Sequence, residues 1–319
     1  MSRRVTLLAL TGSLIAVLVS AEPSQAGWKG APVIPKLNGQ TRANVLATLG
    51  RGGRLGNRLD VFAKVGDSLT QSATFAQPLG CGRWTAGGHR GLTRAVRRYA
   101  ERRLPGASSY CRPVNSFSRN SAAALARQTS SWPLQRGASP DPSCRAAETP
   151  LACEIRRTRP AYALILLGSN DVALALALGR DPLPGFIANM RRMVRRSRAL
   201  GVVPVLTTIP PQALDEAEHS VERLNAALHR LAARRGVALL NLWRVLAPLP
   251  NAGLAADGLH LSVYGGPDCV GPCDPNTCAP ACEPANFTTA GLGYGADARN
   301  LVTAVLLRRL SRLQPPSDG

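Results

Sequence analysis

The sequence predicts an α/β fold built on a mainly parallel β-sheet. Short apolar runs of strand length alternate along the chain with longer segments of helical period. The connections between successive runs are long enough for a helix to cross back over the sheet. The run 161–167 is apolar at every position, which is typical of a strand buried on both faces.

The first strand is expected at 59–65, a short and mostly apolar run that ends at Gly66. A basic amphipathic helix is expected at 91–104, because its apolar residues share one side and Pro105 stops it. The segment 105–158 is rich in proline and has too little apolar periodicity for a core of its own. We therefore interpret it as a long loop of the main domain.

The second half of the chain continues the alternation. Strands are expected at 161–167, 202–207 and 237–240, and helices at 186–200, 215–235 and 301–313. Glycine directly follows the first two of these helices, as is common at helix C-termini. Pro204 speaks against a strand at 202–207, because proline cannot donate a ladder hydrogen bond.

The 319 residues suffice for one large domain, which we expect at 59–313. An extension rich in Gly, Pro and Arg precedes it at 27–58, with a short helical stretch at 41–49. A cysteine-rich insertion is expected at 266–286 and a C-terminal tail at 314–319.

Residues 1–26 are typical of a secretory signal peptide. Arg3 and Arg4 precede an apolar stretch over 5–19, and small residues follow it. A retained N-terminal anchor is the alternative. No later segment is apolar enough to span a membrane, so we expect a secreted or cell-envelope protein without a transmembrane segment in the mature chain.

The chain has eight cysteines, an even number that favours disulfides in an exported protein. Cys144 can pair with Cys153 across a short loop, and Cys81 with Cys111. The remaining four lie in the insertion at Cys269, Cys273, Cys278 and Cys282. Their spacing lacks the close pairs of a zinc knuckle, so we favour disulfides over a metal site.

The net charge is +20, and the arginines recur along the predicted helices instead of forming one tail. We interpret them mainly as solvated helix faces that also favour electrostatic association with anionic envelope polymers. Aromatic residues make up only 4% of the chain, which argues against single-stranded nucleic acid as a specific partner.

Three motifs contain the side chains that an acyl-transfer site needs: Gly66-Asp67-Ser68-Leu69, Gly168-Ser169-Asn170-Asp171 and Asp257-Gly258-Leu259-His260. Ser68 stands just beyond a strand end, where functional groups of parallel sheets gather. Gly66 lets the backbone turn sharply beside it. The structural alternative for Ser68 is the N-cap of a helix.

His260 is the candidate base among four histidines. Asp257, three residues earlier, can hold the imidazole through Nδ1–H and leave Nε2 for Ser68. The alternative is a surface turn in which the two side chains only bond each other. Asn170, at the end of the strand 161–167, can donate its amide to an oxyanion, and the alternative is an Asx turn. We expect Asp171 to cap the next segment.

On these motifs, and in this order, the chain resembles the SGNH, or GDSL-type, hydrolase superfamily over about residues 59–313. The resemblance implies a three-layer, flavodoxin-like α/β/α fold and ester hydrolysis by the triad Ser68, His260 and Asp257. It also implies an oxyanion hole of the Ser68 N–H, the Asn170 amide and a glycine N–H.

The chain departs from the family pattern where that glycine is expected, because Asn120 stands there. Its backbone N–H is the candidate third donor, since Asn tolerates left-handed backbone. We expect a secreted carboxylic ester hydrolase that needs no cofactor or metal and acts on short acyl esters, including those on glycans. Lipid esters are the alternative substrate class. A non-catalytic glycan- or polyanion-binding protein on the same fold is the alternative function.

Overall fold

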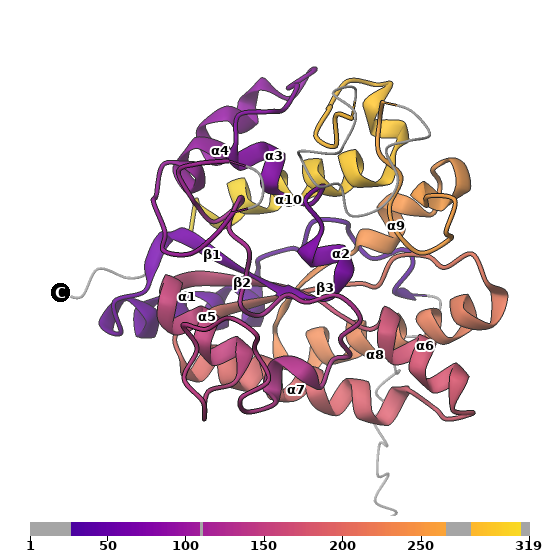
Figure 1. The fold of residues 1–319 in the computed structure, drawn as a ribbon, viewed down its shortest axis with the longest axis horizontal. Coiled ribbons are helices and arrows are strands. Elements are labelled where there is room, and N and C mark those ends of the chain that lie inside the picture. Colours follow the sequence, from indigo (N-terminus) through magenta and orange to yellow (C-terminus); the bar gives the residue numbers. More distant parts are fainter. Residues whose placement is uncertain (1–26, 109–110, 266–281, 314–319) are drawn as a thin grey trace, which may run out of the picture.

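The computed structural model describes residues 27–108, 111–265 and 282–313. Its strands form one sheet in the order β1-β2-β3-β4, with every neighbouring pair parallel (Figure 1). They are β1 (Arg58–Gly66), β2 (Pro160–Leu166), β3 (Val203–Thr207) and β4 (Ala238–Leu240). The predicted α/β class with a parallel sheet is confirmed.

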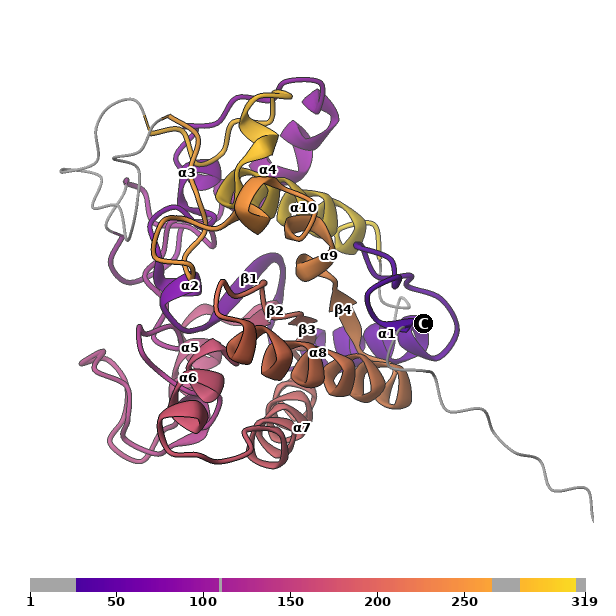
Figure 2. The ribbon, with the colours of Figure 1, turned by 90° about the vertical axis from the view of Figure 1, so that its right-hand side faces the viewer.

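Helices cover both faces of this sheet (Figure 2). The face with α4 and α10 also receives α1 at one end, and α5 to α8 cover the opposite face. The α-helices are α1 (Gly39–Arg54), α2 (Ser68–Gln71), α3 (Gln77–Gly80), α4 (Thr93–Ala100), α5 (Pro150–Thr158), α6 (Ser169–Ala177), α7 (Leu183–Ala199), α8 (Asp215–Arg235), α9 (Leu242–Leu246) and α10 (Gly295–Leu310). Single 3₁₀ turns are η2 (Arg90–Leu92), η3 (Trp132–Leu134), η4 (Pro250–Gly253) and η5 (Gly291–Gly293).

The two faces of the sheet bury separate apolar clusters, because successive side chains of a strand point to opposite sides. On β2, Leu164 packs with the α10 side while Ala163 and Ile165 pack with the α5–α8 side. Both clusters are closed to solvent, and this accounts for a strand that is apolar at every position. The core therefore holds three layers together.

The predicted strands agree with the observed ones to within a residue or two. Pro204 lies inside β3 but faces only one partner strand in register, Ala163 of β2. Pairing of β3 with β4 begins one residue later, at Val205. Pro204 therefore has no partner on β4, so its missing N–H removes no hydrogen bond on that side of β3.

The helices differ more from prediction. Helix α8 has the predicted bounds, but α4 ends at Ala100, before the expected end at 104. The Leu104 N–H instead donates to the Val114 carbonyl. Helix α5 falls in the segment interpreted as loop, although Thr149 caps it and Pro150 stands in its first turn. This start of a helix was not recognised in the sequence, because prolines are frequent throughout the segment.

The segment before β1 belongs to the same core. Trp28 is buried edge-on against Trp243, and Val45 and Leu49 of α1 pack in the cluster on the α10 side. The Asn241 N–H donates to the Val33 carbonyl. The predicted extension 27–58 thus packs against β3, β4 and α9.

Two predicted disulfides are present, Cys81–Cys111 and Cys144–Cys153. Cys282 is also disulfide-bonded, whereas Cys269, Cys273 and Cys278 lie outside the described residues. The predicted signal peptide at 1–26 and the tail at 314–319 lie outside them as well. Within the described ranges, no helix is long and apolar enough to cross a membrane.

The two chain segments that flank residues 266–281 are pinned to one carboxylate. Asp297, in the first turn of α10, accepts hydrogen bonds from the backbone N–H groups of Tyr264 and Asn286. The Glu283 N–H donates to the Tyr264 carbonyl. Burial raises the pKa of Asp297 to about 7, although both hydrogen bonds act to lower it. Both flanks are therefore fixed relative to α10.

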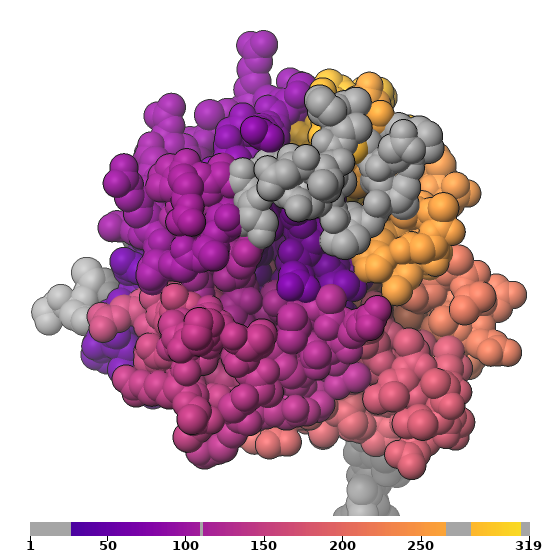
Figure 3. Space-filling model, in the orientation of Figure 1, coloured from indigo at the N-terminus to yellow at the C-terminus, as the bar shows by residue number. Residues whose placement is uncertain are grey.

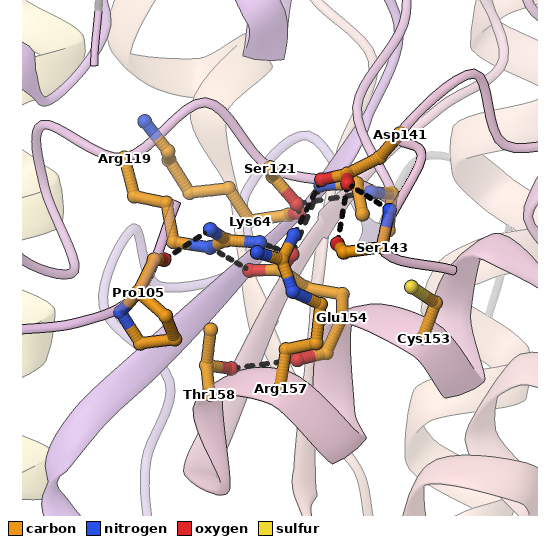
Figure 4. A network of polar contacts seen from close by, with 12 residues as sticks. Lys64, Pro105, Arg119, Ser121, Asp141, Ser143, Cys153, Glu154, Arg157 and Thr158 are labelled. Atoms are coloured by element: carbon orange, nitrogen blue, oxygen red, sulfur yellow. Dashed lines mark hydrogen bonds and ion pairs between the residues drawn. The ribbon is translucent and has the colours of Figure 1, made fainter. Parts of the chain in front are cut away.

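A buried ion pair ties the long loop to α5 (Figure 4). Arg119 donates from Nε and Nη2 to the two carboxylate oxygens of Glu154, at 3.1 and 2.8 Å. Each side chain is only 2% exposed, and Glu154 also accepts the Ala122 N–H. Nearby, the buried Lys64 of β1 donates to the Phe117 carbonyl at 2.7 Å. Burial lowers the pKa of Lys64 to about 7, which Glu154 counteracts.

Glu154→Gln should lower the free energy of unfolding by about 3–5 kcal/mol, because it leaves the buried Arg119 charge without a counterion. Asp60→Asn is the matched control, since it breaks the more exposed ion pair with Arg102 and should cost about 1 kcal/mol or less. Urea unfolding of both variants measures the difference. Equal losses would show that the buried pair is no more important than the exposed one.

Candidate active site

The first motif forms the turn at the end of β1. Gly66 ends the strand, Asp67 caps the single turn α2, and Ser68 is the first residue of α2. A Cβ atom at Gly66 would lie 2.1 Å from Thr70 Oγ1 and 2.5 Å from the Leu166 carbonyl, so only glycine fits. The Ser68 N–H is at a helix N-terminus, where no intrahelical acceptor exists.

The last motif forms a tight turn around the Asp257 carboxylate. Its Oδ1 accepts the backbone N–H groups of Leu259 and His260, at 3.0 and 2.9 Å. Its Oδ2 lies 2.5 Å from His260 Nδ1. Gly258, at a φ of 67°, supplies the left-handed residue that the turn requires. Carboxylate and imidazole are thus held as one unit, as the sequence predicted for their spacing.

His260 and Ser68 meet although 192 residues separate them in the chain. His260 Nε2 lies 3.0 Å from Ser68 Oγ, within hydrogen-bond reach. Partial burial acts to raise the pKa of Asp257, but hydrogen bonds from the His260 ring and from the Leu259 and His260 N–H groups lower it overall. Ionised Asp257 favours Nδ1–H and leaves Nε2 able to accept the serine proton.

The second motif begins at the end of the adjacent strand β2. Gly168 has a φ of 132°, and a Cβ atom there would lie 2.3 Å from Ile209 Cδ1. Asn170 is in the first turn of α6, and its Nδ2 donates to the Gln128 carbonyl at 3.2 Å. An amide nitrogen has two hydrogens, so one remains for another acceptor.

Asp171 anchors the loop that accepts from Asn170. Its carboxylate receives the Ser130 backbone N–H at 2.8 Å and the Ser130 hydroxyl at 2.5 Å. Asn189 also donates to the Ser130 hydroxyl. Burial raises the pKa of Asp171, which these hydrogen bonds only partly offset. We expected a capping role, and the structure shows instead a tie between α6 and the segment around Gln128.

The structure does not bring Asn120 to this site. Its backbone N–H donates to the Ala107 carbonyl at 2.9 Å, so this donor is already used. Ala124 forms a parallel bridge with Gly66, which puts Asn120 four positions back, toward the start of β1. Residues further along the same loop contact α2 instead, where the Ala126 N–H donates to Gln71.

Two buried side chains of opposite charge, Asp67 and Arg299, contact the backbone of α2. Asp67 is 1% exposed, and its Oδ1 accepts the Leu69 N–H while Oδ2 has no hydrogen-bond partner among the described residues. Arg299 of α10 is 4% exposed, donates to the Leu69 carbonyl and stacks on Phe75. Leu69 is thus held at both its N–H and its carbonyl.

Burial dominates the ionisation of this pair. It raises the pKa of Asp67 to about 6, an effect that the Leu69 N–H and the Arg299 charge partly oppose. It lowers the pKa of Arg299 to about 9, which the Asp67 charge partly opposes. Arg299 was not identified from the sequence, because the chain has many arginines and no local pattern distinguishes this one from the others.

The three motifs converge at the carboxyl ends of β1 and β2. In Figure 3 the violet segment that includes α2 lies between the magenta part of the long loop and the orange segment before His260. Among the described residues, no group of three or more His, Cys, Asp or Glu could hold a metal ion. The arrangement suits proton transfer from a serine hydroxyl to an imidazole.

A family model described as the GDSL-like lipase/acylhydrolase family matches residues 65–265. No curated protein matches the chain significantly. Among solved structures, an acetylxylan esterase from Geobacillus stearothermophilus, in a catalytic mutant, is similar at a TM-score of 0.43 and 16% identity. The match covers 80% of this chain and 96% of that one. An acetyl esterase mutant with acetate matches at a TM-score of 0.48 and 16% identity, over 78% and 98% of the two chains.

Asp67→Asn should change how stability depends on pH. Folding raises the pKa of Asp67 from 3.8 to about 6, so between these values the folded protein binds more protons than the unfolded chain. The free energy of unfolding of the wild type should therefore fall relative to that of the variant as pH rises from 4 to 7, by about 2–3 kcal/mol at most. Asn keeps the capping acceptor.

Urea unfolding of both proteins at several pH values between 4 and 8 tests this expectation. Asp60→Asn serves as the control for loss of one carboxylate, because Asp60 belongs to the more exposed ion pair with Arg102. If the wild type and Asp67→Asn have parallel stability curves over this range, Asp67 does not titrate as its burial implies.

Proposed function

Because the chain belongs to the GDSL-like lipase/acylhydrolase family, we propose that it is a secreted serine esterase whose nucleophile is Ser68. Membership makes it a carboxylic ester hydrolase at the family level. The observation that carries the specific proposal is the contact chain from Asp257 through His260 to Ser68, with heavy-atom distances of 2.5 and 3.0 Å. The 3.0 Å contact between His260 Nε2 and Ser68 Oγ is within the reach that general-base activation of a serine requires.

In the proposed mechanism, Ser68 Oγ attacks the ester carbonyl carbon while His260 Nε2 takes the hydroxyl proton. Asp257 holds Nδ1–H and stabilises the imidazolium that forms. The tetrahedral intermediate collapses as His260 gives the proton to the leaving alcohol, and an acyl-enzyme remains. His260 then takes a proton from a water molecule as the water oxygen attacks the acyl carbon. When this second intermediate collapses, the bond between Ser68 Oγ and the acyl carbon breaks, His260 returns the proton to Ser68 Oγ, and the carboxylic acid is released.

Two donors support stabilisation of the oxyanion in this proposal. The Ser68 N–H is at the N-terminus of α2, and the second amide hydrogen of Asn170 remains available beyond its bond to Gln128. Asn120 is not retained as a third donor, because its N–H bonds the Ala107 carbonyl. Arg299 and Asp67 act as positioning residues, since they hold Leu69 next to the nucleophile.

For the substrate, we propose short acyl esters, including acyl groups on glycans, with lipid esters as the alternative. The net charge of +20 supports association with anionic polymers of the cell envelope. Disulfides such as Cys81–Cys111 are compatible with export, since they persist in oxidising compartments.

A fluorophosphonate probe should label Ser68, with the adduct located by mass spectrometry. His260→Ala should abolish labelling and lower hydrolysis of p-nitrophenyl acetate by about 10³-fold or more, because the hydroxyl loses its base. His219→Ala, which removes an exposed histidine from α8, is the matched control and should label normally. Absence of labelling in the folded wild type would favour the non-catalytic binding protein.

Asn170→Ala should lower kcat by about 10²–10³-fold with little change in KM, because the lost amide acts on the transition state. Steady-state kinetics on p-nitrophenyl esters of two to eight acyl carbons measure this loss and the preferred acyl length. Asn44→Ala on α1, whose amide donates to the Arg235 carbonyl, is the control for loss of a structural amide. A wild-type kcat for Asn170→Ala would exclude this residue from the oxyanion hole.

A further inference from the structure

A concave site lies on the α5–α8 face of the sheet, away from Ser68. It is a cavity of about 500 Å³ between α7 and the segment that runs from η3 to α5. We call it the α7 groove, and its lining residues are Leu134, Arg136, Arg145, Ala147, Glu148, Thr149, Leu151, Ala152, Arg192, Arg196, Ala199 and Leu200. A volume of this size accommodates a small organic molecule.

The charge of the α7 groove is strongly unbalanced. Arg136 and Arg145 contribute from one wall, and Arg192 and Arg196 contribute from successive turns of α7 on the other. None of these four arginines forms an ion pair with any part of the chain that the structure describes. Like charges four residues apart on a helix repel each other, so an anion between the walls relieves an existing cost.

The acidic residue of the α7 groove, Glu148, is paired mainly with Arg156, although its Oε2 also accepts the Arg145 backbone N–H and the Arg145 charge helps to lower its pKa. Both of its carboxylate oxygens accept from Arg156, each at 2.8 Å, and Arg156 does not line the groove. Hydrogen bonds from Arg156 dominate the lowering of the pKa of Glu148. The carboxylate therefore stays ionised and paired, and the field inside the groove is positive.

The wall opposite α7 is a built structure and not a loose loop. The Cys144–Cys153 disulfide joins it to α5, and the Gly137 N–H donates to the Glu148 carbonyl at 2.9 Å. At its start, Trp132 is buried and donates from Nε1 to the Ala138 carbonyl. Arg136 and Arg145 are thus carried on a braced segment, which reduces the ordering cost of binding.

The rest of the α7 groove is apolar. Leu134, Leu151 and Leu200 line it together with three alanines, and none of the lining residues is aromatic. Without aromatic faces the groove lacks the usual platform for stacking sugars or bases. Leucine and alanine instead suit a short aliphatic chain.

The fold separates the α7 groove from the catalytic edge. Ala199 and Leu200 lie at the end of α7, just before β3 begins at Val203, so this part of the groove is at the amino end of the strands. Ser68 and Asn170 follow the carboxyl ends of β1 and β2. An occupant of the groove need not be the ester that Ser68 attacks.

We propose that the α7 groove binds an amphiphilic phosphate monoester. Its phosphate lies between the arginines of the two walls, and its aliphatic chain lies against the leucines. A phosphate monoester carries close to two negative charges at neutral pH, which matches several arginines better than a monocarboxylate does. Guanidinium groups bind its oxygens through paired, charge-assisted hydrogen bonds.

Isothermal titration calorimetry with octyl phosphate below its micelle concentration tests the proposal on the mature, disulfide-bonded chain. Octyl phosphate should bind at least about tenfold more tightly than inorganic phosphate, which lacks the chain, and than octyl glucoside, which lacks the charge. Equal affinities for octyl phosphate and inorganic phosphate would overturn the proposal, since the apolar residues of the α7 groove would then contribute nothing to binding. Tighter binding of an acidic polysaccharide such as polygalacturonate would overturn it in favour of a polymer site.

A matched pair of double variants locates the site. Arg192→Gln/Arg196→Gln should weaken octyl phosphate binding by about tenfold or more, because both charges line the groove. Arg191→Gln/Arg195→Gln removes two exposed charges at the same spacing on α7 outside the groove, and should change binding by less than about twofold. Equal losses in the two variants would show attraction by net charge alone and contradict a specific site. Fluorophosphonate labelling of Ser68 reports separately on the proposed esterase function.

Discussion

The site depends on the close packing around Gly66, where β1 ends. Its N–H donates to the Ala123 carbonyl and its carbonyl accepts the Leu125 N–H, so the long loop is pinned to the strand end. On the other side the Leu166 carbonyl of β2 leaves no space for a side chain. This one residue therefore sets the positions of α2, β2 and the loop relative to one another. Ser68, two residues further on, is placed by that convergence, and His260 reaches it from the separate turn after α9.

Buried charge surrounds this junction to an unusual degree. Lys64 in β1, the Asp67–Arg299 pair beside α2 and the Arg119–Glu154 pair under the loop are all nearly inaccessible to water. Burying charge is costly unless partners compensate it, and here the partners come from distant segments. Arg299 on α10 and Glu154 on α5 thus make the nucleophile turn sensitive to the correct assembly of both helical layers.

The catalytic edge and the α7 groove differ in chemistry because they lie on different parts of the fold. The carboxyl edge of the sheet gathers polar loop residues with one histidine and one serine in contact. The α7 groove gathers arginines over leucines, on a wall that a disulfide braces. Part of the net charge of +20 therefore lines cavities such as the α7 groove, and part of it lies on the exposed helix surfaces.

The sequence by itself determined the parallel α/β class, the strands, and the local unit of Asp257 and His260. The alternating apolar runs and the three-residue spacing between Asp257 and His260 are local patterns. Local patterns can be recognised in the sequence without the structure. The Cys81–Cys111 and Cys144–Cys153 pairs were also expected from loop placement and are present. Helix α5 was missed because proline is common both in loops and in the first turn of a helix.

Only the tertiary structure decided which distant groups meet. The clamp of Arg299 on Leu69 and the tie of Asp171 to Ser130 join segments far apart in the chain, and the Asn120 N–H bonds Ala107 within the long loop. No periodicity encodes such pairs, because they arise from how the layers pack. The same holds for the α7 groove. No sequence pattern distinguishes its four arginines from the others, and only the fold places them around one cavity.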